Sequence, residues 1–358
     1  MRARTVLGFS VGAVGVLLLA AAAMLYWVVL PSQAKLPSDT NTTRLFNGTA
    51  KLLLNPQAVA SGNLTNAIVT NTPVAVTRTV KVLATDGNAA EVSDARTLTT
   101  AATKQVIGKT EATYAVDRKS LEPAGQHPAS WQVIDQQGLT VSWPIGAKKQ
   151  DYTGWVNETQ TTTPLRYLRE ESHAGVNTYV YQAKSAAATI KDPQVLATLP
   201  KALPVTALGA LAKVLPIPAD LQAQLAALLP RLTEPVPLTY TYESTSTYWV
   251  EPTSGIVVDV QREEIRKAGL SLPGGASVPA SIPVYDVTTA VTQDSQQAAA
   301  QDAQDARNTI DFFGKTLPLA LLVLGALALI GAVILIVTAR RGGRRMAAAS
   351  GSAGPSPG

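Results

Sequence analysis

Two long runs of apolar residues lie near the two ends of the chain. The first runs from Val6 to Leu30 and the second from Leu317 to Thr338, and neither contains a charged residue. Each run exceeds the roughly 20 residues that a helix needs to cross the hydrocarbon core of a membrane. The pattern therefore predicts two membrane-spanning helices, at residues 6–30 and 317–338.

Most of the sequence between these runs alternates between apolar and polar residues. In residues 73–85 one face would carry Val74, Val76, Val80 and Val82, and the other Thr77, Thr79 and Lys81. A period of two is typical of a half-buried strand. Similar β-branched runs, separated by turn residues, recur through residues 31–291. We therefore expect an α+β protein with a large antiparallel sheet, sandwich or barrel in this domain.

Residues 192–232 interrupt the alternation with a stretch rich in alanine, leucine and proline. Because proline both starts and ends helices, this stretch predicts two or three short helices. One interpretation is a cap buried on the sheet, and the other is a partly exposed apolar surface that contacts lipid or a partner. For the second interpretation, the candidate ligand-binding residues are Leu203, Leu208, Leu211, Leu215, Leu221, Leu225, Leu228 and Leu229.

The remaining segments complete the predicted organisation. Residues 292–316 are rich in alanine and glutamine and predict a juxtamembrane helix leading into the second apolar run. Residues 1–5 form a short basic tail. Residues 339–358 end in an Ala/Gly/Ser/Pro sequence that is typical of a disordered tail.

Basic residues indicate the orientation in the membrane. Arg2 and Arg4 precede the first apolar run, Arg340, Arg341, Arg344 and Arg345 follow the second, and neither tail contains an acid. The positive-inside rule then predicts cytoplasmic termini at the plasma membrane and an extracytoplasmic main domain. Between the tails 24 Lys and Arg face 25 Asp and Glu. The net positive charge of the chain thus comes from the tails that flank the membrane spans, and we expect no nucleic acid partner.

The alternative for the first run is a cleaved signal peptide, with Ser32-Gln33-Ala34 as the small-residue cleavage site. The run has 25 residues, whereas the apolar region of a signal peptide has about 7 to 15. The length therefore favours a retained helix.

The sequence offers little catalytic chemistry. It contains no cysteine and two histidines, His127 and His173, of which His173 follows Glu170 and Glu171 closely. It lacks the spacing of a metal site, a nucleophile elbow, a P-loop and a dinucleotide-binding glycine motif. We therefore expect a non-enzymatic protein without a metal or cofactor.

The segment VSWPIGAKKQDYTGWV, residues 141–156, gathers aromatic, basic and acidic residues. We interpret it as a hairpin, because Pro144 would end a first strand at Trp143 and Gly146 would permit the turn. Lys148, Lys149 and Gln150 would form the solvated crest, and Tyr152 and Trp155 would begin the next strand.

Residues 138–183 resemble the actinobacterial membrane proteins of the PorA family. The matching residues are Pro144-Ile145-Gly146, Lys149, Asp151-Tyr152, Trp155, Thr163-Pro164, Tyr167, Glu171, Gly175 and Tyr179. The hairpin at residues 248–260 and the two-helix frame also fit, whereas Val156 departs from the acidic residue common after the motif tryptophan. The family label suggests a porin-like pore without implying a proven one.

A weaker likeness is to the scavenger-receptor class B family, which shares two terminal spans around a large β-rich domain. Residues Glu251-Pro252-Thr253-Ser254-Gly255 are similar to a turn of that family. In those proteins lipids move through an apolar tunnel in the domain. The shared architecture therefore implies, by analogy, that this chain also binds or transfers lipids.

The sequence thus predicts a two-span envelope protein that binds or transfers an apolar ligand such as an envelope lipid. The expected partners are membrane lipids and that ligand, and a homo-oligomer or an envelope protein partner is left open. The alternatives are a non-catalytic envelope scaffold protein and a porin-like pore.

Overall fold

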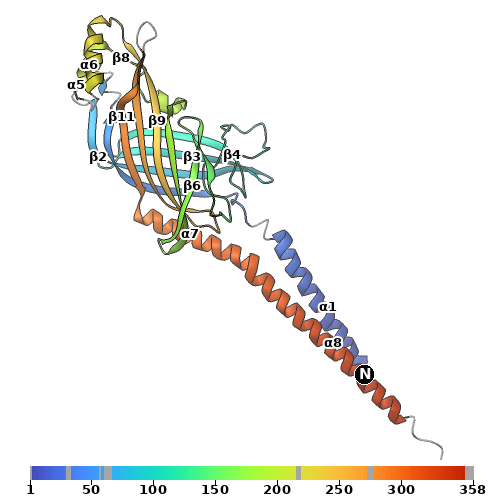
Figure 1. The fold of residues 1–358 in the computed structure, drawn as a ribbon. Coiled ribbons are helices and arrows are strands. Elements are labelled where there is room, and N and C mark those ends of the chain that lie inside the picture. The colour runs from blue at the N-terminus through green and yellow to red at the C-terminus, as the bar shows by residue number, and fades with distance from the viewer. Residues whose placement is uncertain are drawn as a thin grey trace, which may run out of the picture. The chain divides into compact units, whose positions relative to one another are not determined.

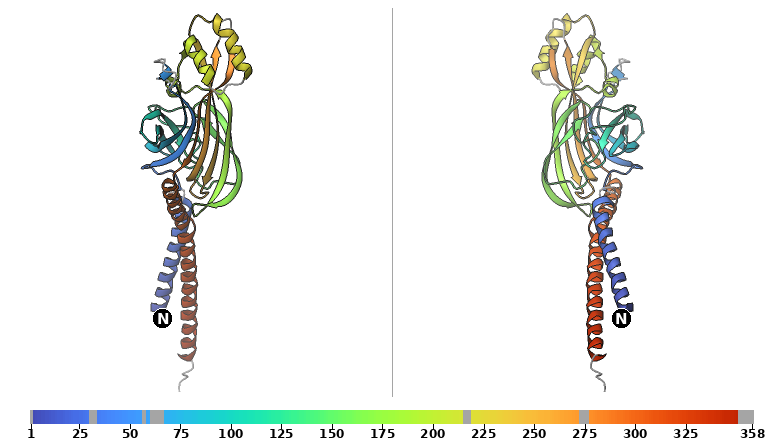
Figure 2. Two further views of the ribbon diagram at one scale, coloured as in Figure 1. Left: turned by 90° about the vertical axis from the view of Figure 1, so that its left-hand side faces the viewer. Right: turned by 90° about the vertical axis from the view of Figure 1, so that its right-hand side faces the viewer.

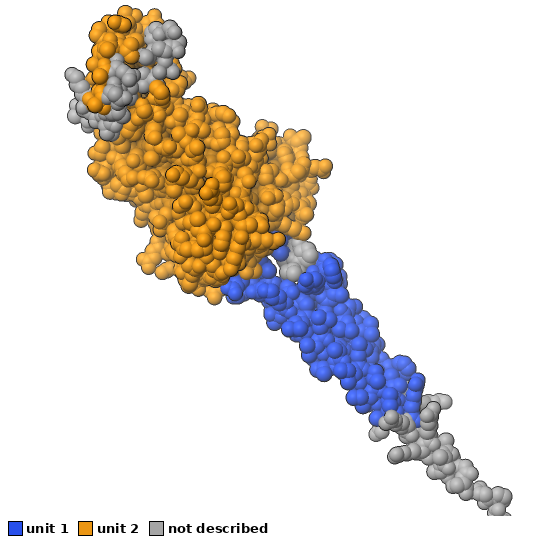
Figure 3. Space-filling view, viewed as in Figure 1, with its two compact units in different colours: residues 1–35, 305–358 blue, residues 36–304 orange. Residues whose placement is uncertain are grey.

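The computed structural model of the 358-residue chain divides into two compact units (Figure 3). Unit 1 comprises residues 1–35 and 305–358, and unit 2, the β-rich unit, comprises residues 36–304. The structure describes residues 2–29, 34–55, 58–59, 67–214, 219–271 and 277–350.

Unit 1 contains the two predicted apolar helices. Helix α1 spans Arg2–Met24 and continues as a π-helical turn, Leu25–Val29, while a second π-helical turn, Phe312–Thr316, precedes α8, Leu317–Ser350. The two helices pack closely, since a Cβ added to Gly15 would lie 3.0 Å from the carbonyl oxygen of Gly325. Both apolar stretches, Val6–Val29 and Gln293–Arg340, are long and apolar enough to cross a membrane.

The β-rich unit is built on one antiparallel sheet. Its strands are β1 (Asn41–Leu54), β2 (Ile68–Asp86), β3 (Ala89–Thr100), β4 (Val106–Asp117), β5 (Tyr152–Val156), β6 (Thr161–His173), β7 (Val176–Thr189), β8 (Ala202–Leu203), β9 (Val236–Val250), β10 (Val257–Ser271) and β11 (Ser277–Val291). The strands follow the order β4-β3-β2-β1-β11-β10-β9-β7-β6-β5, and β8 pairs with β9. The predicted antiparallel β-rich fold is confirmed.

The sheet curls into a half-barrel, as Figures 1 and 2 show. The edge strands β4 and β5 are connected by residues 134–139, which form a parallel bridge to each: Ile134 pairs with Tyr114, and Leu139 pairs with Gly154. The amide of Ile134 donates to the carbonyl of Thr113 at 2.8 Å, and that of Leu139 donates to Thr153 at 2.8 Å. The segment therefore supplies hydrogen-bond partners to edges that would otherwise be unpaired.

Short helices lie at one end of the sheet (Figure 1). They are α4 (Pro193–Ala197), α5 (Val205–Val214), α6 (Ala219–Leu228) and a 3₁₀ turn, Leu229–Arg231. The carboxylate of Asp192 caps α4 by accepting from the amide of Gln194 at 2.8 Å. A longer helix, α7 (Gln293–Asp311), follows β11. The predicted short helical insertion is thus present.

The predicted hairpin at residues 141–156 is wrong in its first arm. Residues 139–151 form no named strand, and β5 pairs with β6 instead. The chain at Trp143 follows the turn after β9: its amide donates to the carbonyl of Gly255 at 3.2 Å, and the hydroxyl of Ser142 donates to the same oxygen at 2.6 Å. Gly255 has a φ of +74°, and an added Cβ would lie 2.3 Å from the Trp143 carbonyl oxygen. The segment around Trp143 and the turn at Gly255, far apart in the chain, therefore pack directly against each other.

Candidate functional site

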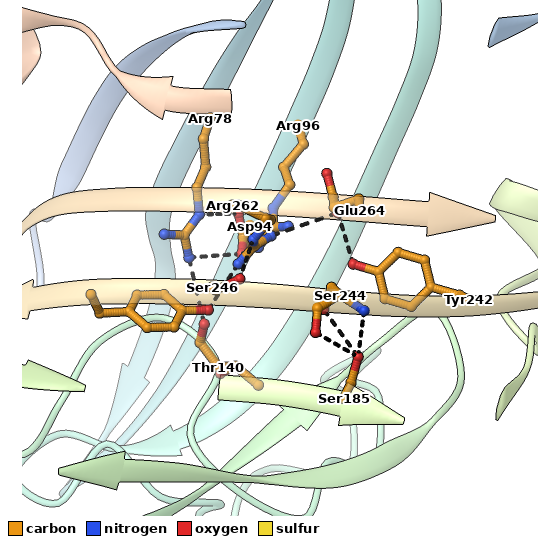
Figure 4. Close-up of polar contacts among 11 residues, drawn as sticks. Arg78, Asp94, Arg96, Thr140, Ser185, Tyr242, Ser244, Ser246, Arg262 and Glu264 are labelled. Atoms are coloured by element: carbon orange, nitrogen blue, oxygen red, sulfur yellow. Dashed lines mark hydrogen bonds and ion pairs between the residues drawn. The ribbon is translucent and has the colours of Figure 1, made fainter. Parts of the chain in front are cut away.

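Charged residues interrupt the inward-facing rows of several strands. On β2, Arg78 lies between valines of the same face, and on β3, Asp94 and Arg96 follow the buried Val92. Figure 4 shows these side chains meeting others that come from β10. We call the set the charged interior; it consists of Arg78, Asp94, Arg96, Glu158, Arg262, Glu264 and Arg266.

Asp94 is the centre of the first ion-pair group. Its carboxylate accepts two parallel bonds from the guanidinium of Arg78, both 2.9 Å long, and a third from Arg96 at 3.4 Å. Asp94 is 6% exposed. Burial by itself would raise the pKa of Asp94, but the two arginines outweigh burial and hold the pKa well below its usual range. Asp94 is therefore a buried carboxylate whose charge is compensated.

The β10 side of the charged interior is held by hydroxyl groups of β9. Arg262 donates from Nε to Ser246 Oγ and from a terminal nitrogen to Tyr248 Oη, each at 3.0 Å. Tyr242 donates its hydroxyl to Glu264 at 2.8 Å. Burial opposes ionisation of Tyr248, yet the charge of Arg262 and the hydrogen bonds from Ser246 and Arg262 together outweigh burial and lower the pKa of that phenol. Arg262, Arg96 and Arg266 likewise lower the pKa of Glu264 against the effect of burial.

Two cavities adjoin the charged interior. The polar cavity has a volume of about 100 Å³, and its lining includes Arg78, Asp94 and Arg262. The aliphatic cavity has a volume of about 110 Å³, and its apolar lining includes Leu53, Leu54, Leu98, Ile107, Val195 and Leu199. Arg96, Thr110 and Glu158 line both cavities. Arg96 and Glu158 therefore border both the polar and the aliphatic cavity.

The predicted ligand-binding leucines occupy varied positions. Leu203 and Leu208 are buried in an apolar cluster of the sheet, and Leu228 and Leu229 are half-buried. Residue Leu215 lies outside the described residues, as do the side chains of Leu211, Leu221 and Leu225. No described residue of the range 203–232 lines the polar or the aliphatic cavity. Their role in binding stays a prediction.

The two histidines have structural neighbours. His127 stacks on Trp131, with ring centroids 5.8 Å apart. His173 ends β6, stacks on Trp249 and lies with its Nε2 atom 3.0 Å from a carboxylate oxygen of Asp259. Among the described residues, no three or more His, Asp or Glu side chains form a group that could hold a metal ion.

The charged interior was not predicted, although the sequence contains a signal for it. The inward row of β2 was identified through its valines, and Arg78 has the same even-numbered parity. On β10 the row runs from the buried Val260 through Arg262, Glu264 and Arg266 to the buried Ala268. A charged residue flanked on its own face by buried residues must itself face the interior.

These features define a membrane protein with two apolar helices and one large β-rich unit whose interior is charged. Residues 7–334 match the family described as porin PorA, and the chain belongs to this family. The resemblance predicted from the motifs is thereby confirmed. The likeness to the scavenger-receptor class B family gains no support and stays a prediction.

The other comparisons are less informative. No curated protein matches the chain. Among solved structures, a conserved hypothetical protein of Mycobacterium tuberculosis with a double hotdog fold is 12% identical, with a TM-score of 0.14, over 76% of this chain and 80% of that one. A monomeric dehydratase domain of a trans-AT polyketide synthase is 8% identical, with a TM-score of 0.12, over 69% and 81%. Scores this low support no argument about fold or function.

Proposed function

We propose that this chain is a membrane-anchored, non-enzymatic protein whose β-rich unit binds or transfers an apolar or amphiphilic envelope molecule such as a lipid. The observation that carries the proposal is the aliphatic cavity. Its walls include Leu98, Ile107 and Leu199, while Arg96 and Arg266 add charged groups to the same lining. An apolar chain with a polar end would find partners for both parts in this lining.

The size of the cavity limits the ligand. A volume of about 110 Å³ is below the roughly 300–1,000 Å³ of a site that encloses a whole drug-sized ligand. The aliphatic cavity would therefore take the end of an apolar chain, and the rest of the molecule would lie outside it. The half-buried Leu228 and Leu229 of the helical insertion favour a second apolar contact, as the sequence predicted.

Native mass spectrometry of the detergent-purified chain tests the proposal. The wild type should retain a lipid-sized adduct, and Ile107→Asn should lower its occupancy several-fold by placing an amide in the cavity wall. Val106→Asn is the matched control, because Val106 is the neighbouring residue of β4 and is 59% exposed. Equal occupancy in the two variants would contradict binding at this cavity. A wild type without a lipid adduct would favour the alternative of a non-catalytic envelope scaffold protein. Conductance in planar bilayers would favour the alternative of a porin-like pore.

The topology is part of the same proposal. Six arginines in the two tails support cytoplasmic termini at the plasma membrane and an extracytoplasmic β-rich unit. Because the chain has no cysteine, single cysteines can be introduced without a background. A membrane-impermeant thiol reagent applied to intact cells should label Thr162→Cys and leave Ser350→Cys unlabelled. Labelling of the second variant alone would reverse the assigned orientation.

A further inference from the structure

Buried polar atoms without a hydrogen-bond partner gather around the polar cavity. Five residues of its lining carry one each: Thr140 Oγ1, Trp143 Nε1, Trp155 Nε1, Asn157 Oδ1 and Thr163 Oγ1. In the described part of the chain, two other buried side-chain atoms lack such a partner, Arg266 Nε and Asp286 Oδ1. Each buried polar group left unbonded costs about 1–3 kcal/mol. Five such groups around one cavity indicate a site for a molecule that bonds to them.

Five of the six charged groups of the same lining have side-chain or backbone partners. Asp94 is bound by Arg78 and Arg96, and Arg262 by Ser246 and Tyr248. Asp192 accepts from Asn157 Nδ2 and from the amide of Gln194, each at 2.8 Å. The lining contains three arginines and three carboxylates, counting Glu158. It therefore has no formal net charge, and a charged ligand gains little there.

The unpartnered atoms are all neutral and of mixed character. The indoles of Trp143 and Trp155 donate, the amide oxygen of Asn157 accepts, and the hydroxyls of Thr140 and Thr163 do either. A ligand that satisfies them must donate and accept at several points. Alcohol hydroxyls do both, whereas an inorganic anion mainly accepts and an ammonium only donates.

We propose that the polar cavity binds a neutral polyhydroxyl group, such as a small polyol or a sugar ring. The volume of about 100 Å³ is several times the 10–15 Å³ that one water molecule needs. Thr163 is 6% exposed and Trp143 is 4% exposed, so both offer their unpartnered atoms away from bulk water. The polyhydroxyl group is either a free compound or the headgroup of a lipid. The site does not depend on the apolar ligand proposed for the aliphatic cavity.

Calorimetric titration of the full chain in nanodiscs, with D-glucose, myo-inositol and an octyl glucoside below its micelle concentration, tests this site. The substitutions Trp155→Phe and Thr163→Val each remove one hydrogen-bonding atom and preserve most of the shape of the side chain. Each should weaken binding about three- to tenfold, the usual effect of one lost hydrogen bond. Trp131→Phe and Thr162→Val are matched controls outside the lining, and Thr162 is exposed. Unchanged thermal unfolding midpoints would show that the variants are folded.

Binding of glucose or inositol with these losses supports a free polyol, and binding of octyl glucoside alone supports a lipid headgroup. Absence of binding by all three probes overturns the proposal, as does equal weakening by the control variants. A crystal structure of the chain crystallised with the probes that shows only ordered water in the cavity also overturns it. Ile107→Asn should leave polyol binding unchanged, so failure at the aliphatic cavity is distinguishable from failure here.

Discussion

The helical insertion, residues 192–232, and the charged interior lie in the same β-rich unit, and their buried side chains are stabilised by opposite means. In the insertion, Leu203 and Leu208 pack in an apolar cluster with aromatic residues of the sheet such as Tyr240. In the charged interior, the buried Asp94 is compensated by direct hydrogen bonds from the half-buried Arg78. A leucine-rich segment can therefore serve packing, while charges on an inward face mark where buried groups require specific partners.

The two regions also differ in what a substitution does. Burying apolar surface stabilises roughly in proportion to its area, and truncation leaves a cavity. A buried ion pair adds little net stability compared with a well-packed apolar replacement, but removing one partner leaves an uncompensated charge. We therefore expect the largest losses from changes that break the charge compensation and smaller ones from changes in the insertion.

Asp94→Asn should have the largest effect. It leaves Arg78 and Arg96 facing a neutral amide in the interior, which should cost about 3–5 kcal/mol of unfolding free energy. Asp135→Asn is the control, because Asp135 is exposed, and it should change stability by less than about 0.5 kcal/mol. Urea denaturation of the purified chain followed by tryptophan fluorescence measures both. Equal small losses in the two variants would show that the buried charges of this group need no compensation.

The same residue predicts an acid dependence. The pKa of Asp94 is lower in the folded chain than in the unfolded chain, where it is about 3.9. Its stabilising contribution is then complete above the unfolded pKa and is lost as the pH falls through the folded pKa. Wild-type stability should therefore decrease as the pH falls below about 4. Asp94→Asn should lack this part of the decrease, measured as denaturation midpoint against pH.

The sequence predicted the strands because their alternation is local. Val74 and Val82 lie on the buried face of β2, as the period of two requires. Arg78 has the same parity, but its partner Asp94 is on β3, and its second partner is the carbonyl oxygen of Thr140, 3.5 Å away, which no local pattern connects to it. The even-numbered position of Arg78 could thus indicate that it faces the interior. Which residues it pairs with could be seen only once the sheet had curled and brought distant parts of the chain together.

The hairpin predicted at residues 141–156 was wrong in its first arm for a similar reason. Local turn chemistry at Pro144 and Gly146 favoured a hairpin, and Gly146 does have a φ of +75°. Trp143 nevertheless takes its backbone partner from Gly255, more than a hundred residues later. Tertiary hydrogen bonds replaced the expected local ones, and single-sequence patterns do not encode such distant pairings.

Leu208→Ala should have the second-largest effect. Leu208 is 3% exposed in α5, so the lost apolar contacts and the remaining cavity should cost about 2–3 kcal/mol. Leu228→Ala, in the half-buried last position of α6, should cost less than about 1 kcal/mol. Denaturation midpoints of the two variants measure the difference. A larger loss for Leu228 would contradict the view that the buried leucines are the structural ones.

Ser246→Ala should have the smallest effect of the three stability changes. Ser246 is 3% exposed and accepts the Nε hydrogen of Arg262 at 3.0 Å, a bond to a charged group that contributes about 1.5 kcal/mol. The loss stays small because Tyr248 continues to hold the guanidinium. Ser172→Ala, at an exposed serine of β6, should be nearly neutral and serves as the control. If Ser246→Ala were also neutral, water inside the polar cavity would be replacing the serine, and the charged interior would be less strictly paired than the insertion is packed.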